Sequence, residues 1–69
     1  MKVDLRKIKR IREEKGISAK DMAEELGYKH YQSYWRIENG KRGIKIEHLI
    51  KLSKILGVPL EDLIKEEEK

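Results

Sequence analysis

Four short segments of this chain each repeat apolar residues at helical spacing and then reach a glycine. Residues three and four positions apart share one face of an α-helix, so each segment predicts a helix with one buried side. A glycine just past the last apolar residue is typical of a helix end, because glycine readily takes the left-handed conformation of a C-terminal cap. These glycines are Gly16, Gly27, Gly40 and Gly57.

Capping residues mark where several of these helices begin. Asp4 and Ser18 can each accept a hydrogen bond from a backbone N–H that is unpaired at a helix start. Pro59 suits the first turn of a helix, because its missing N–H is not needed there. We expect a loose start at residues 1–3, no strand, and five helices that begin near Leu5, Ala19, Tyr31, Ile46 and Pro59.

The length of 69 residues and the absence of cysteine limit how the chain can be stabilised. A domain of this size buries only about 60% of its unfolded surface. Without thiols, neither disulfides nor thiolate metal sites can reinforce it. We therefore expect a single all-α domain over residues 1–69, with a packed core over about 5–64 and an acidic tail at 65–69.

The charge and hydropathy of the chain exclude some classes of protein. Lys and Arg number 17 against 13 Asp and Glu, a formal net charge of +4. This excess permits nucleic-acid binding without establishing it. No apolar run approaches the roughly 20 residues of a membrane span, and the start lacks the apolar core of a signal peptide. We expect a cytoplasmic protein that does not associate with membranes.

The segment 31–40 carries the most chemical information. Helical spacing places Tyr34 and Ile37 on an inward face, with Glu38 beside them. The opposite face combines a planar amide, a guanidinium and two aromatic rings, which come from Gln32, Arg36, Tyr31 and Trp35. Glutamine pairs with adenine, arginine with guanine, and apolar groups meet the thymine methyl. The alternatives are an ordinary solvated face for the two polar residues and a surface cluster for the two aromatics.

Four stretches of the chain resemble the lambda-repressor/Cro-like helix-turn-helix family, also called the XRE family. Two helices joined by a glycine turn are common, but a match over five helices that includes Arg-Ile-Glu-Asn-Gly is specific. The resemblance covers about Leu5 to Ile64. Its motifs are Arg-Glu-Glu-Lys-Gly-Ile-Ser at 12–18, Met-Ala-Glu-Glu-Leu-Gly at 22–27, Arg-Ile-Glu-Asn-Gly-Lys-Arg at 36–42 and Leu-Ile-Lys-Leu-Ser-Lys-Ile-Leu-Gly-Val at 49–58.

The resemblance implies a compact five-helix, lambda-repressor-like bundle in which helices 2 and 3 form the helix-turn-helix. Helix 3 would enter the major groove of double-stranded DNA. The implied function is sequence-specific regulation of transcription, which we expect to be repression by a homodimer. The resemblance also implies a buried ion pair between Arg12 and Glu38. We expect any dimer contact to use the loops and the fifth helix, around Leu60 and Ile64.

Matched position by position, the resemblance assigns contacts to DNA. It places Tyr31, Gln32 and Arg36 at base-contacting positions, and we expect Trp35, which shares their outward face, to contact bases as well. Phosphate contacts are expected from Asn39, Lys41 and Arg42, with Lys20 and Lys29 as further candidates. For the two basic residues after helix 3, a solubilising loop is the alternative.

The chain departs from the family in three places. Ala19 stands where family members usually have a glutamine that holds a phosphate, so this contact is lost or Lys20 replaces it. The turn at 28–30 makes the segment before helix 3 one residue longer than the commonest form. Trp35 stands where a small or polar residue is usual, and it either meets DNA or packs against Tyr31 or Tyr28.

The sequence gives less support to other classes of function than to DNA binding. His30 and His48 are the only histidines, and zinc needs about four N or S ligands, so we expect no metal and no cofactor. We interpret His30 as a turn residue and His48 as a helix surface residue. No catalytic triad or phosphate-binding loop is evident, so an enzyme is not expected. The rivals are a protein-binding adaptor or antitoxin-like module, with aromatic anchors at Tyr31 and Trp35, and a purely structural helical module.

Overall fold

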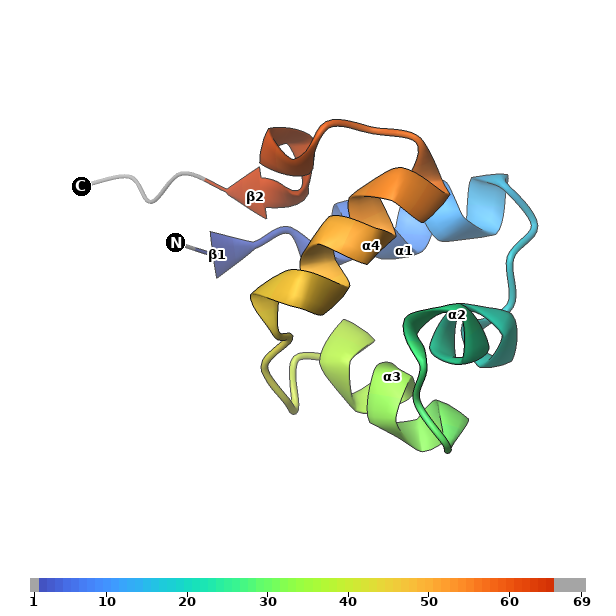
Figure 1. Ribbon diagram of the computed structural model, residues 1–69. Coiled ribbons are helices and arrows are strands. Elements are labelled where there is room, and N and C mark those ends of the chain that lie inside the picture. The colour runs from blue at the N-terminus through green and yellow to red at the C-terminus, as the bar shows by residue number, and fades with distance from the viewer. Residues whose placement is uncertain (1, 66–69) are drawn as a thin grey trace.

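Four α-helices, a short 3-10 helix and a two-stranded sheet make up residues 2–65, the part of the chain that this computed structural model describes (Figure 1). The α-helices are α1 (Leu5–Glu14), α2 (Ala19–Leu26), α3 (Tyr31–Glu38) and α4 (Ile46–Leu56). The 3-10 helix is η1 (Leu60–Leu63), and the strands are β1 (Lys2–Val3) and β2 (Ile64–Lys65).

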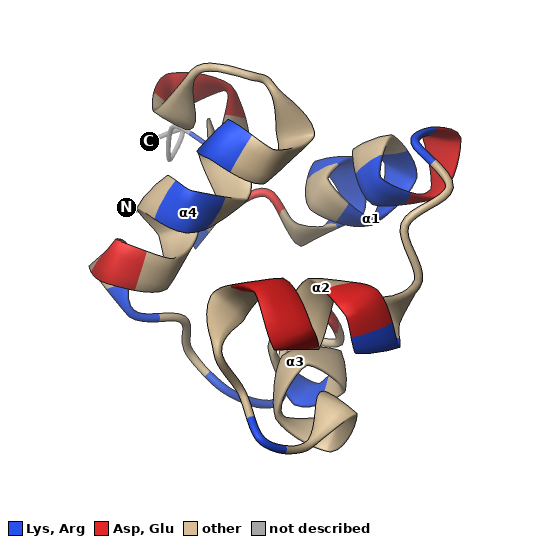
Figure 2. Ribbon diagram, turned by 45° about the vertical axis from the view of Figure 1, so that its right-hand side comes forward, with Lys and Arg blue, Asp and Glu red and all other residues tan. Residues whose placement is uncertain are grey.

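α2 and α3 pack against each other more closely than any other two α-helices of the described chain. α1 and α4 lie in the upper part of both views, and α2 and α3 lie below them (Figure 1, Figure 2). α3 packs mainly against α2 and also contacts α1, whereas α2 also contacts α4. The helix-turn-helix formed by α2 and α3 is therefore held from one side by the other two helices.

The expectation of five helices is wrong, because the residues after Pro59 form one turn of 3-10 helix and not a fifth α-helix. Leu60, Leu63 and Ile64 do follow helical spacing. However, Ile64 already has an extended backbone, with φ −116° and ψ 131°, because it pairs with β1. This pairing ends the helix after a single turn, and single turns are where the tighter 3-10 geometry is usually found.

An antiparallel ladder joins the two ends of the described chain. Lys2 pairs with Lys65 and Val3 with Ile64. The expectation of a loose start without strands is therefore wrong for Lys2 and Val3. A strand of two residues is too short to show the alternation by which a sequence reveals a strand. Of the acidic tail expected at 65–69, residues 66–69 lie outside the described residues.

The helix boundaries follow the capping residues that mark them in the sequence. The side chain of Asp4 accepts a hydrogen bond from the backbone N–H of Lys7 at 3.2 Å, and that of Ser18 accepts from Asp21 at 3.0 Å. The four glycines expected at helix ends all have positive φ angles, between 70° and 89°. Both N-caps and all four glycine stops are thus confirmed.

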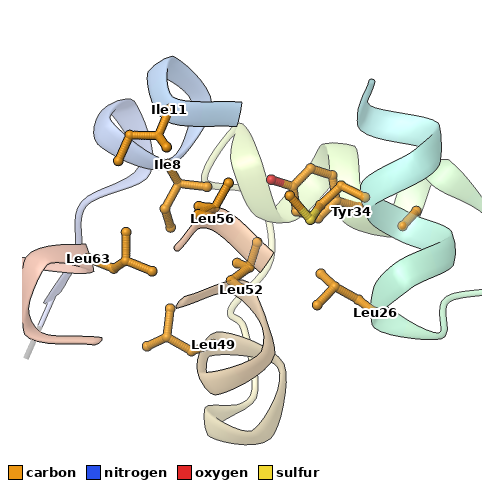
Figure 3. Packing of buried hydrophobic residues seen from close by; sticks show 10 residues of the cluster. Ile8, Ile11, Leu26, Tyr34, Leu49, Leu52, Leu56 and Leu63 are labelled. Carbon is orange, nitrogen blue, oxygen red and sulfur yellow. The ribbon is translucent and has the colours of Figure 1, made fainter. Parts of the chain in front are cut away.

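The apolar core is centred on α4. Leu49, Leu52 and Leu56 lie along its inner side and are at most 1% exposed. Side chains of α1 and η1 pack on one side of this row, and those of α2 and α3, including Tyr34, lie on the other (Figure 3). Full burial of a leucine contributes about 1.5–3 kcal/mol, so α4 supplies a large part of the stability.

A buried ion pair joins the end of α1 to the end of α3, as the family resemblance implies. Arg12 donates two hydrogen bonds to the carboxylate of Glu38, from Nε and from Nη2, both at 2.9 Å. Its remaining nitrogen, Nη1, donates to the backbone carbonyl of Ile17 at 2.6 Å. The side chains of Arg12 and Glu38 are 9% and 6% exposed. Arg12 therefore fixes three segments at once: α1, the α1–α2 turn and α3.

Removing Arg12 should strongly destabilise the fold. We expect Arg12→Ala to lower the free energy of unfolding by about 3–5 kcal/mol, because a buried carboxylate loses its partner. Urea unfolding followed by circular dichroism measures this loss. Arg10→Ala, an exposed arginine on the same helix, is the matched control. A loss of less than about 1 kcal/mol, which is the usual contribution of an exposed ion pair, would show that the pair between Arg12 and Glu38 contributes little to stability.

The ion pair between Arg12 and Glu38 should also make the stability of the fold depend on pH in the acid range. Burial acts to raise the pKa of Glu38, but hydrogen bonding and attraction to Arg12 outweigh it, so the pKa lies below its ordinary value of 4.5. A carboxyl group whose pKa is lower in the folded state than in the unfolded state stabilises the fold at pH values above its unfolded-state pKa. This stabilisation is lost as the pH falls through the folded-state pKa. We expect the stability difference between the wild type and Glu38→Gln to shrink below pH 4.5.

The control for this pH effect is Glu24→Gln, which removes an exposed carboxylate from α2. Its stability difference from the wild type should change much less over the same acid range. If the stabilities of the wild type and Glu38→Gln changed with pH in parallel, the lowered pKa of Glu38 would be contradicted.

Candidate nucleic-acid interface

One face of α3 is fully available to a ligand. Its exposed residues are the four outward residues identified from helical spacing: Tyr31, Gln32, Trp35 and Arg36. Tyr34 and Ile37, on the other side of the helix, are at most 2% exposed. Tyr31 and Trp35 remain 49% and 46% exposed, and adjacent exposed aromatics commonly mark a binding surface.

The exposed face of α3 carries positive and no negative charge. Glu38 is the single carboxylate of this helix, and Arg12 neutralises it on the inward side. Arg36 therefore has no exposed acidic neighbour on its own helix. Figure 2 shows basic segments in the turn before α3, on α3 and in the loop after it, whereas acidic segments lie along α2.

Basic side chains flank α3 at both of its ends. Lys20 and Lys29 line a hollow of about 300 Å³ beside the start of α3, together with Tyr31 and Gln32. Lys41 and Arg42 follow the end of the helix, and both line a second groove between this loop and β1. The structure therefore brings the expected phosphate-binding residues into two groups, one at each end of the expected base-contacting residues.

Asn39 follows the last residue of α3 and caps the helix end, a role that helical spacing does not reveal. Its side-chain amide donates a hydrogen bond to the backbone carbonyl of Trp35 at 2.8 Å, at the C-terminal end of α3. The backbone N–H of Asn39 donates to the same carbonyl at 3.0 Å, and the backbone N–H of Lys41 donates to the carbonyl of Arg36 at 2.8 Å. These bonds close the end of α3 and hold the loop that carries Lys41 and Arg42 against it.

Tyr28, His48 and Arg42 form a cluster that links the helix-turn-helix to α4. The Tyr28 hydroxyl hydrogen-bonds to Nδ1 of His48 at 2.6 Å, with the two rings edge to face. The guanidinium of Arg42 lies 5.8 Å from the centre of the Tyr28 ring, within reach of a cation–π attraction. Burial raises the pKa of Tyr28, although Arg42 opposes the rise, so the hydroxyl keeps its proton at neutral pH.

The interpretation of His48 as a surface residue missed this contact. His48 is partly buried and holds the enlarged turn in place through Tyr28. Helical spacing places His48 on the same side of α4 as the apolar Ile55, seven residues later. It does not indicate Tyr28, 20 positions earlier, as the partner.

A comparison with protein-family models matches residues 8–63 to a helix-turn-helix family model, HTH_3. This match covers most of the chain and includes all of α2, the turn and α3. The chain belongs to the helix-turn-helix family of the XRE, or lambda-repressor-like, type. No curated protein matches the chain closely enough to be significant.

Family membership gives the exposed face of α3 a chemical meaning. Members of this helix-turn-helix family are DNA-binding regulators of transcription, and the chain is a double-stranded DNA-binding domain of this class. Within residues 2–65, no three side chains of the metal-binding types gather into a site. No helix in the same residues is long and apolar enough to cross a membrane.

The contact between Tyr28 and His48 should be measurable as a coupling energy. We expect Tyr28→Phe and His48→Ala each to destabilise the fold, and the double variant to lose less than the sum of the two. The coupling should be about 1 kcal/mol, the usual net contribution of a hydrogen bond. Urea unfolding of the four proteins measures it. Strictly additive losses would show that this bond contributes nothing to stability.

Proposed function

We propose that this helix-turn-helix domain is a sequence-specific repressor that places α3 in the major groove of a two-fold symmetric operator. The observation that carries the proposal is the exposed face of α3, where Gln32 and Arg36 lie beside two exposed aromatic side chains. A major groove about 12 Å wide admits a single α-helix, and each base pair there presents a distinct pattern of donors and acceptors.

Each of the four exposed residues of α3 has a base that it suits. Gln32 can pair with adenine through its amide, and Arg36 with guanine through two parallel hydrogen bonds. Tyr31 and Trp35 supply apolar surface that suits thymine methyl groups or sugars. Tyr31 and Gln32 also occupy the first turn of α3, which is the part of a recognition helix that usually meets base edges.

The basic groups at the two ends of α3 support the same orientation. Lys20 and Lys29 at its start, and Lys41 and Arg42 after its end, would contact phosphates on the two sides of the groove. Asn39 would add a contact through the part of its amide that does not cap α3. Such contacts set the position of a protein on the duplex but carry no sequence information.

Repression by a homodimer follows from the small size of the reading surface. One helix contacts only a few base pairs, so a single copy would discriminate weakly. Two copies related by a two-fold axis place their recognition helices about 34–36 Å apart, one turn of DNA. Repression requires only that a bound dimer occupies a promoter, whereas activation requires a further contact with the transcription machinery.

Selection of bound sites from a random duplex pool, at physiological salt, tests the proposal. We expect a symmetric motif with two half-sites one turn apart. Gln32→Ala and Arg36→Ala should each remove about 1–3 kcal/mol of preference at one base position of each half-site. Arg10→Ala, an exposed arginine on α1, should leave the motif unchanged.

Phosphate contacts should behave differently from base contacts in the same assay. We expect Lys41→Ala to weaken binding to all sequences alike and to reduce the salt slope of binding by about one. Unchanged preferences in Gln32→Ala and Arg36→Ala would contradict base contact by α3. No enriched motif from a folded protein would favour the alternative of a protein-binding adaptor with anchors at Tyr31 and Trp35.

A further inference from the structure

Two pairs of large apolar side chains are exposed within residues 2–65. Tyr31 and Trp35 belong to the DNA-facing side of α3, whereas Ile46 and Ile50 lie on α4 and are 50% and 39% exposed. Ile46 and Ile50 are four positions apart, so they are neighbours on one side of α4. This isoleucine face has no role in the core and no place in the proposed contacts with DNA.

Leu60 and Ile64, expected from the sequence to form a dimer contact, are occupied within the domain. Both are partly buried and pack against the core, and Ile64 pairs with Val3 in the sheet. A second copy would therefore find little free apolar surface there. Within residues 2–65, Ile46 and Ile50 are the two large aliphatic side chains that remain more than a third exposed.

We propose that the isoleucine face of α4 is the homodimer interface, and that two α4 helices pack antiparallel across a two-fold axis near Ile50. This inference rests on the proposed function, because it supplies the interface of the DNA-bound dimer. In a two-fold interface the same patch of each copy meets the other, so a single apolar face is sufficient.

Charges beside the isoleucine face favour a second copy of this chain over other occupants. Glu47 and Lys54 are both exposed and lie seven residues, or two helical turns, apart on the same flank of α4. Neither forms an ion pair within residues 2–65. An antiparallel copy reverses the order of these charges, so Glu47 of each copy lies near Lys54 of the other. The flank is thus complementary to itself.

The position of this face also suits a dimer on DNA. Ile46 begins α4 immediately after the loop that carries Lys41 and Arg42, and the start of α4 lies beside that loop in Figure 1. A second copy on this face would bring the C-terminal ends of the two α3 helices toward a common axis. The contact is small, so we expect DNA to strengthen it by holding the two copies together.

Disulfide cross-linking tests the interface without DNA. The chain has no cysteine, so a single introduced thiol reports on one position. With oxidised glutathione, we expect Ile50→Cys to form a covalent dimer at least about tenfold faster than Lys51→Cys, an exposed neighbour turned away from the face. Equal rates for the two variants, with both proteins folded, would overturn the interface.

Charge reversal tests the antiparallel arrangement on DNA. The quantity measured is the ratio of affinities for a duplex with two half-sites and one with a single half-site, which cancels general effects of charge on DNA binding. We expect Glu47→Lys and Lys54→Glu each to lower this ratio about fivefold or more, and the double variant to restore it. Failure of the double variant to restore the ratio would overturn the antiparallel pairing.

The results separate this inference from the proposed function. Selective cross-linking of Ile50→Cys without any enriched DNA motif would keep the interface and reject DNA reading by α3. A symmetric DNA motif with equal cross-linking of both cysteine variants would keep DNA reading and reject the α4 interface.

Discussion

The position of α3 depends on the ion pair between Arg12 and Glu38. Arg12 holds the last residue of α3 and the carbonyl of Ile17 at the same time, so α1, the α1–α2 turn and α3 are fixed together. The pair also has an electrostatic consequence. It keeps the one carboxylate of α3 turned inward and neutralised, and it thereby leaves the outer side of the helix attractive to a polyanion.

The fold could be predicted from the sequence wherever the signal was local. Apolar residues at helical spacing, the caps at Asp4 and Ser18, and the four glycines located α1 to α4 correctly. The last helix could not be located this way, because Leu60, Leu63 and Ile64 have helical spacing while Ile64 is held in a strand by Val3. That pairing joins residues at opposite ends of the chain, and no local pattern encodes it.

The candidate site shows the same division between local and distant signals. Helical spacing alone identified the four exposed residues of α3, since burial on a helix follows its period. The contact of Tyr28 with His48 links residues 20 positions apart and was missed. The second role of Asn39, as a cap on α3, was also missed, because the same spacing suits both capping and exposure. Which bases α3 would prefer in the proposed complex depends on side-chain chemistry that the fold does not determine.

The short ladder between β1 and β2 has a mechanical consequence. Because Lys2 lies opposite Lys65 and Val3 opposite Ile64, the chain enters and leaves the domain at the same end of the ladder. Force that separates the two ends therefore loads the hydrogen bonds one after another, as in a zipper, and not all together in shear. Tension between the ends would therefore open the ladder before it loads the packed helices.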